Sequence, residues 1–202
     1  AFYTRRQLDA RLPYVDGGQI DLGRNYFGLG TQTSGSKNKW LWQYGIESAA
    51  QYDARIRFKN NMGAKGEETL HQNERFYSLG AYGVTEFSYL DWRLRAALRA
   101  DMHRITLTDF LDTNTGKKDL AAVSPSIAIH REFSRFFSSY VRWGTGFETP
   151  SLNELSANPS GKTGFNNALE PQKSSETELG ILFRKKKFDA SLTFFYTKTK
   201  NE

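Results

Sequence analysis

Apolar and polar positions alternate along most of this chain with a period of two. The clearest example runs from Asp91 to Arg104. One set of alternate positions there is apolar and the other is rich in arginine: Trp92, Leu94, Ala96, Leu98 and Ala100 against Arg93, Arg95, Ala97, Arg99 and Asp101. A β-strand sends successive side chains to opposite faces, whereas a helix would spread these arginines around its cylinder. The pattern predicts a strand with one apolar face and one wet face.

The same rhythm predicts about nine strands whose connections alternate between short and long. Short turns are predicted near residues 34–38, 88–90, 131–132 and 185–187, and longer loops at 13–23, 60–73, 105–120 and 147–173. Since each antiparallel hairpin reverses the chain, the short turns fall at one edge of the sheet and the loops at the other. The run from Lys39 to Lys59 is long for a soluble domain and suits a tilted strand that crosses a bilayer and projects beyond it.

A long excursion interrupts the alternation in the last third of the chain. Tyr140 to Gly146 reads as a strand, and Pro150 ends it because proline cannot donate a ladder hydrogen bond. Residues 151–171 are rich in Asn, Ser, Gly and Pro and read as a loop. Alternation resumes after Pro171, with Leu179, Ile181 and Phe183 on one face.

This excursion resembles a sequence element of the TonB-dependent outer-membrane receptors. Gly146-Phe147-Glu148-Thr149-Pro150-Ser151-Leu152-Asn153-Glu154-Leu155 is similar to their G-F-x-x-P-[ST]-x-x-E-L element, and Leu169-Glu170-Pro171, Ser174, Ser175, Glu178 and Gly180 are similar to the L-x-P-E-x-[ST] and E-x-G that follow. Gln172 stands where that family often has Glu. The resemblance implies an all-β fold: an antiparallel up-and-down transmembrane β-barrel, of which these strands form part of a set of about 22.

The chain begins and stops within predicted strands, at Ala1–Tyr3 and at Thr193–Glu202. We therefore expect residues 1–202 to be a partial receptor β-barrel domain, from which the plug domain and the C-terminal strands are absent. The apolar faces carrying Leu94, Leu98 and Leu192 are expected to meet lipid acyl chains, and the alternate faces a water-filled interior.

Composition adds only modest constraints to this interpretation. No window holds about 18 consecutive apolar residues, but a barrel strand crosses a membrane with every second position apolar, so a mean hydropathy of -0.63 is compatible with a barrel. Aromatic residues make up 14% of the chain, as interface girdles would require. There is no cysteine, which excludes disulfides and thiolate metal sites. The net charge of +6 is spread along the chain, which does not favour a nucleic-acid partner.

The chain shows no pattern typical of catalysis, a cofactor or a metal. His71, His103 and His130 have no spacing of metal-site type, and no nucleophile elbow, P-loop or dinucleotide motif occurs. Carboxylates gather around the long loop, where we expect loop hydrogen bonds and a polar interior: Glu148, Glu154, Glu170, Glu176 and Glu178. We predict that the protein is not an enzyme and needs no cofactor.

Two sets of side chains allow two interpretations each. The inward arginines Arg93, Arg95, Arg99 and Arg142 could attract an anionic chelate or, as we favour, pair with carboxylates on neighbouring strands. The tryptophans Trp40, Trp42, Trp92 and Trp143 could stack on a sugar or, as we favour, anchor the membrane interface.

The resemblance implies a multi-pass receptor of the bacterial outer membrane that imports a scarce nutrient, which we expect to be a ferric siderophore. Its implied partners are the TonB complex, reached through the absent plug and N-terminal box, and outer-membrane lipid and lipopolysaccharide. The expected ligand contacts lie in the long loop and the lumen: Glu148, Asn153, Glu154, Asn166, Asn167 and Arg142. The alternatives are a soluble all-β glycan-binding module and, third, a β-rich hydrolase using loop carboxylates.

Overall fold

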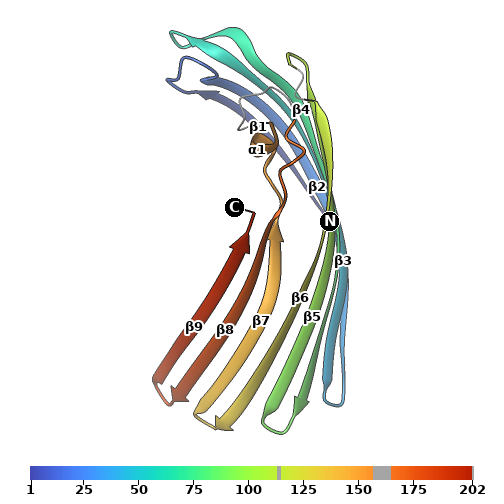
Figure 1. The fold of residues 1–202 in the computed structure, drawn as a ribbon, viewed down its shortest axis with the longest axis vertical. Helices are drawn as coiled ribbons and strands as arrows, with labels where there is room; N and C mark the ends of the chain where they lie inside the picture. Colours follow the sequence, from blue (N-terminus) through green and yellow to red (C-terminus); the bar gives the residue numbers. More distant parts are fainter. Residues whose placement is uncertain (113–114, 157–164, 202) are drawn as a thin grey trace.

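A computed structural model describes residues 1–112, 115–156 and 165–201. Within these residues the chain forms nine strands and one short helix: β1 (Phe2–Arg11), β2 (Gln19–Lys37), β3 (Trp40–Asn61), β4 (Ala64–Tyr89), β5 (Trp92–Asp109), β6 (Gly116–Ser134), β7 (Phe137–Glu148), α1 (Leu152–Ser156), β8 (Gln172–Lys185) and β9 (Phe188–Lys200). Each strand pairs antiparallel with the next, so the sheet order is the chain order. Figure 1 shows one strongly curved sheet, and the predicted all-β, up-and-down fold is confirmed.

The sheet does not close on itself. Among the described residues β1 pairs only with β2 and β9 only with β8, so two strand edges lie at the ends of the sheet. The short turns meet at one edge of the sheet, at the bottom of Figure 1, and the other connections meet at the opposite edge. No helix in the described residues is long and apolar enough to cross a membrane.

Several predicted connections are misplaced by a few residues. The turn expected at 131–132 lies at Arg135–Phe136, because Arg131 and Glu132 still pair with Ser139 and Ser138 of β7. The turn expected near 88–90 is centred on Leu90 and Asp91, and the one expected at 34–38 on Asn38 and Lys39. Asn38, Leu90 and Lys186 have positive φ, as tight two-residue hairpin turns require.

The prediction of a polar loop at residues 60–73 is wrong. Strands β3 and β4 run on as a hairpin to Asn61 and Ala64, with Met62 and Gly63 at its tip, both at positive φ. Lysines and glutamates suggested a loop here, but a strand that extends past the apolar zone has water on both faces. Its polarity therefore does not argue against a strand. The loops expected at 105–120 and 13–23 are likewise shorter, because β5 reaches Asp109 and β2 begins at Gln19.

The two faces of the sheet differ in polarity. Leu155 of α1 packs with Ile105 of β5 and Leu120 of β6, so these residues mark the concave face, on which Figure 1 places α1. The residues that alternate with them form the convex face. In the described residues no layer covers that face. Its exposed apolar side chains include Leu79, Leu94, Leu98, Val123, Ile127, Val141, Leu179, Leu192 and Phe194.

Aromatic rings cluster on the convex face next to the short turns. Ring pairs there are Trp40–Phe87 at 4.7 Å, Phe133–Phe137 at 5.4 Å and Phe183–Phe188 at 6.0 Å. A second group, Phe27, Tyr52 and Tyr77, lies further up the strands, where Tyr77 Oη donates to Tyr52 Oη. On β4 the groups are about ten residues apart, which for a strand tilted about 40° gives a height of about 25 Å. That matches the apolar band of a transmembrane barrel. Trp40 and Trp92 lie in the first group; Trp143 lies higher up the face.

Candidate functional site

The long connection between β7 and β8 folds back onto the concave face instead of projecting from the sheet edge (Figure 1). Its helix α1 begins with a reciprocal cap: the Glu154 N–H donates to Ser151 Oγ at 3.3 Å, and the Ser151 N–H donates to Glu154 Oε2 at 2.7 Å. These backbone and side-chain hydrogen bonds from Ser151 lower the pKa of Glu154. The sequence Ser-x-x-Glu is the signal that predicts this helix, which loop composition alone had hidden.

An apolar anchor holds the connection to the wall of the sheet. Leu155 is fully buried against Ile105 and Leu120, and four partly buried residues complete the cluster: Phe76, Leu152, Phe165 and Leu169. The ring of Phe165 lies over Gly116, where a Cβ would stand 2.2 Å from a ring carbon. Only glycine allows this approach. The anchor therefore fixes where the connection crosses the concave face.

A buried lysine adds a polar tie to the same connection. Lys118 of β6 donates from Nζ to the carbonyl oxygen of Asn167 at 2.6 Å and lies 3.9 Å from the Glu170 carboxylate. Sequence composition placed Lys118 in a polar loop, yet it belongs to a strand and is nearly buried. The Asn166 N–H also donates to the Leu155 carbonyl oxygen at 2.7 Å, which ties this part of the connection to α1.

Ion pairs line the concave face beside the anchored connection. Arg24 holds Asp53 with two nitrogens, at 2.9 Å from Nε and 2.6 Å from Nη2, and Gln51 also donates to Asp53. Arg55 donates to Glu74 at 3.2 Å. The two carboxylates are buried from solvent, so each is compensated by the guanidinium beside it.

The favoured interpretation of the inward arginines is confirmed for three of the four. Arg93 pairs with Glu86 of β4 at 3.3 Å, and Arg142 pairs with Glu176 and Glu178 of β8. Arg99 pairs with Glu47 of β3 and also with Asp101 of its own strand, at 2.7 Å. In the described part of the chain Arg95 forms no ion pair. The concave wall is therefore charged but largely self-neutralised, and its arginines act first as ties between strands.

The predicted ligand contacts do not converge on one point. Glu148 ends β7 with an exposed side chain, and Asn167 is exposed beside the anchor. Three others have intramolecular roles: Glu154 caps α1, Asn166 Oδ1 accepts from the Ala168 N–H, and Arg142 pairs within the wall. Asn153 lies on α1, and its side chain is outside the described residues. The loop residues thus gather at the upper mouth of the concave face, while Arg142 lies further down β7.

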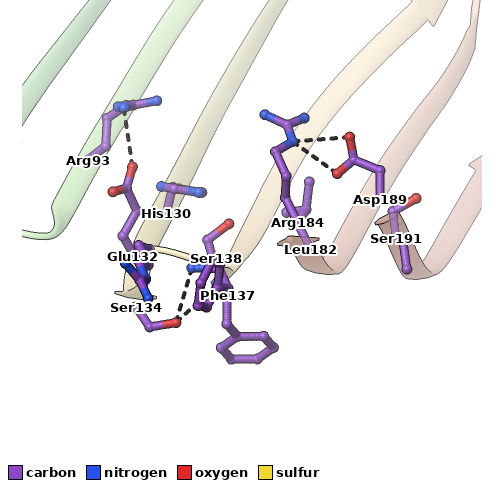
Figure 2. A pocket seen from close by; sticks show the side chains of 13 residues that line it. Arg93, His130, Glu132, Ser134, Phe137, Ser138, Leu182, Arg184, Asp189 and Ser191 are labelled. Atoms are coloured by element: carbon purple, nitrogen blue, oxygen red, sulfur yellow. Dashed lines mark hydrogen bonds and ion pairs between the residues drawn. The ribbon is translucent and has the colours of Figure 1, made fainter. Parts of the chain in front are cut away.

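A hollow of about 560 Å³ lies on the concave face near the short turns. Figure 2 shows Arg93 directed at Glu132 on one side of the hollow and Arg184 directed at Asp189 on the other, with His130 between the two pairs. Over residues 1–112, 115–156 and 165–201 no group of His, Asp or Glu is arranged to hold a metal ion. The concave face thus offers a polar interior with a hollow near the short turns.

The sheet is curved and antiparallel, and its convex face is apolar and bordered by aromatic rings. Its concave face is charged, and the β7–β8 connection folds across it. These features are typical of the wall of a membrane β-barrel. The whole chain, residues 1–202, matches the family described as TonB dependent receptor-like, beta-barrel. The protein therefore belongs to the TonB-dependent receptor β-barrel family, as the sequence element predicted.

Solved structures with the same fold include three transport proteins. The copper transporter OprC superposes with a TM-score of 0.74 at 15% identity, over 88% of this chain and 30% of that one. The ferric citrate transporter FecA superposes with a TM-score of 0.70 at 13% identity, over 98% of this chain and 30% of that one. The ferric yersiniabactin uptake receptor FyuA from Yersinia pestis superposes with a TM-score of 0.67 at 14% identity, over 90% of this chain and 29% of that one. This chain spans about a third of the length of these proteins, and at such identities the likeness shows the fold.

Proposed function

We propose that the protein containing this chain is a multi-pass outer-membrane receptor that binds a scarce nutrient, a ferric siderophore, and imports it with energy delivered through TonB. The observation that carries the proposal is the family match over all 202 residues. The proposal is supported by two proteins with the same fold: FyuA is a ferric yersiniabactin uptake receptor, and FecA is a ferric citrate transporter. The match favours this function over the soluble glycan-binding module, for which a second covering layer would be needed.

The proposed ligand site is the upper mouth of the concave face. The anchored connection lies there, and Glu148 and Asn167 present side chains that have no partner among the described residues. Glu154, Asn166 and Arg142 would act by holding the connection and the wall in shape. Asn153 belongs to the same short helix. The plug and the N-terminal box that meets TonB would be supplied by other parts of the receptor.

Uptake of labelled metal by cells tests the proposal. The full-length receptor is expressed in an iron-starved Gram-negative strain that lacks its own ferric siderophore receptors, and ⁵⁵Fe is offered on catecholate, hydroxamate and carboxylate chelators. We expect saturable accumulation from at least one chelate, and loss of that accumulation when the proton gradient is collapsed or TonB is deleted. Changing both Glu148 and Asn167 to alanine is expected to weaken binding of that chelate roughly tenfold, the cost of about 1.4 kcal/mol in lost polar contacts.

Copper uptake provides the contrasting result, because OprC is a copper transporter with the same fold. Accumulation of ⁶⁴Cu with no accumulation from any ferric chelate would overturn the ferric siderophore assignment while leaving the receptor class intact. Accumulation that continues without TonB would overturn the proposal that TonB delivers the energy for import.

A further inference from the structure

Two tyrosines lie flat on the concave face, each over a glycine of the next strand. Tyr82 of β4 pairs directly with Gly45 of β3, and a Cβ added to that glycine would stand 2.4 Å from the ring atom Cζ. The side chain extends past β3, since Tyr82 Oη donates to Gln32 Oε1 of β2 at 2.9 Å. Gln43 Nε2 of β3 donates to the same oxygen at 2.9 Å. Tyr82 therefore lies along the wall instead of pointing into the interior.

The same arrangement recurs between β7 and β8. Tyr140 of β7 pairs with Gly180 of β8, and a Cβ added to that glycine would stand 2.0 Å from the ring atom Cε1. The Tyr140 hydroxyl donates to the carboxylate of Glu178, also on β8. Gly45 and Gly180 both lie on strands that pair with a neighbour on each side. In both places the glycine makes room for the ring, and a hydrogen bond fastens the polar end of the ring to the wall.

A third large side chain lies on the wall in the same way. Arg99 of β5 covers Gly80 of β4, where an added Cβ would stand 2.7 Å from Nη2, and its guanidinium reaches Glu47 of β3. Beyond Leu120, the concave positions of β6 carry small side chains: Ala122, Ser124, Ser126 and Ala128. This part of the wall therefore has little relief, because three large side chains lie flat and those of β6 are small.

The flat side chain of Tyr82 lies where an imported molecule has to pass. On β4, Tyr82 lies midway between Phe87 and Tyr77, which belong to the two aromatic groups that border the apolar band. It is therefore at the middle of the membrane, on the face that looks into the interior. A ring that turned away from the wall here would narrow the passage at its midpoint.

We propose that Gly45 and Gly180 are positioning residues for import: they let Tyr82 and Tyr140 lie flat and so keep the passage along this wall wide enough for the nutrient. The inference rests on the proposed function, because it concerns passage after binding. Alanine would push either ring at least about 1 Å away from the glycine, since the added Cβ would stand 2.4 Å or less from the ring and ordinary contacts begin at 3.4 Å. Transport should then slow while affinity is unchanged, because neither tyrosine belongs to the proposed ligand site.

Uptake and surface binding of ⁵⁵Fe, offered to cells on the same catecholate, hydroxamate and carboxylate chelators, test the proposal in the full-length receptor. Gly45→Ala is expected to lower the maximal uptake rate about fivefold and to change Kd less than about twofold, as a barrier after binding would. Gly180→Ala is expected to act in the same direction. The matched control is Gly30→Ala on the same face of β2, where an added Cβ would meet nothing nearer than 3.5 Å, so its rate is expected to be normal.

Removing the ring separates clearance from stability. Gly45→Ala/Tyr82→Ala loses the hydrogen bond of the ring but no longer needs room for it, so most of the uptake rate is expected to return. The same holds for Gly180→Ala/Tyr140→Ala. Rates are compared per folded receptor, measured by heat-modifiable mobility in electrophoresis. If the tyrosines act only as ties between strands, each double variant will be at least as slow as its single alanine variant, and that result would overturn the proposal.

A second measurement does not depend on what the receptor imports. Nitration of Tyr82 by tetranitromethane, mapped by mass spectrometry in the purified full-length receptor, is expected to be several-fold faster in Gly45→Ala than in the unchanged receptor or in Gly30→Ala. Equal nitration would show that the ring stays flat and would overturn the inference even where uptake is slowed. Faster nitration in a receptor that imports no ferric chelate would overturn the proposed function, and with it the role of the glycines in import.

Discussion

Changing Leu98 to arginine destabilises the membrane-inserted receptor by about 2–4 kcal/mol, the cost of a charge on the lipid face at the bilayer midplane. Leu98 is 54% exposed on the convex face and lies midway along β5 between Trp92, in the aromatic group, and Arg104, which pairs with Asp119 outside the apolar band. The measurement is reversible urea unfolding of the full-length receptor in phospholipid vesicles, followed by tryptophan fluorescence.

Leu94 supplies the matched control on the same strand. It faces the same way but lies two residues from Trp92, so Leu94→Arg is expected to cost only about 1 kcal/mol because its guanidinium reaches the interface. Equal costs at the two positions would contradict a lipid-facing surface, since a water-exposed or protein-covered face has no such dependence on depth.

Changing Leu155 to alanine releases the β7–β8 connection from the concave wall. Leu155 is fully buried, and truncation of a buried leucine costs about 2–5 kcal/mol in a packed cluster. The cluster attaches a single connection to strands that also hold one another by their ladders, so the loss is expected to be local: the barrel strands stay folded while α1 undocks. Hydrogen exchange measured by mass spectrometry is expected to accelerate at least about thirtyfold over the connection, the equivalent of about 2 kcal/mol. Exchange of the β8–β9 ladder is expected to be unchanged.

Leu155→Met is the control for this result, because it conserves volume and is expected to cost less than about 1.5 kcal/mol. Unchanged exchange in Leu155→Ala would show that the capped helix and the Lys118 tie hold the connection without the apolar anchor. Faster exchange throughout the sheet would show that the cluster stabilises the whole wall.

The strands could be predicted from the sequence because a two-faced sheet forces its polarity into a strict alternation, as in β5. The prediction failed where that constraint ends. Beyond the apolar band both faces of the β3–β4 hairpin are wet, so its sequence from Asn60 to Asn73 resembles a loop although it pairs to its tip. The turn predicted at Arg131 and Glu132 was misplaced for the same reason, since charged residues near a membrane interface occur within strands as well as in turns.

The site was harder to predict because its geometry depends on contacts between distant parts of the chain. The family element marked the connection, and three of the four inward arginines pair with carboxylates as expected. Nothing local shows that Leu155 meets Ile105, or that Lys118 is buried beneath Asn167.

The central claim is that the convex face of this sheet meets lipid and the concave face meets water. The most direct test places single nitroxide labels at successive positions from Leu94 to Asp101 in the full-length receptor in bilayers, and measures collisions with molecular oxygen and with a water-soluble nickel chelate. The account predicts alternation with a period of two: high oxygen and low nickel accessibility at Leu94, Ala96, Leu98 and Ala100, and the reverse tendency between them. Labels at those four positions that are shielded from both reagents would reveal a covering protein layer and contradict it.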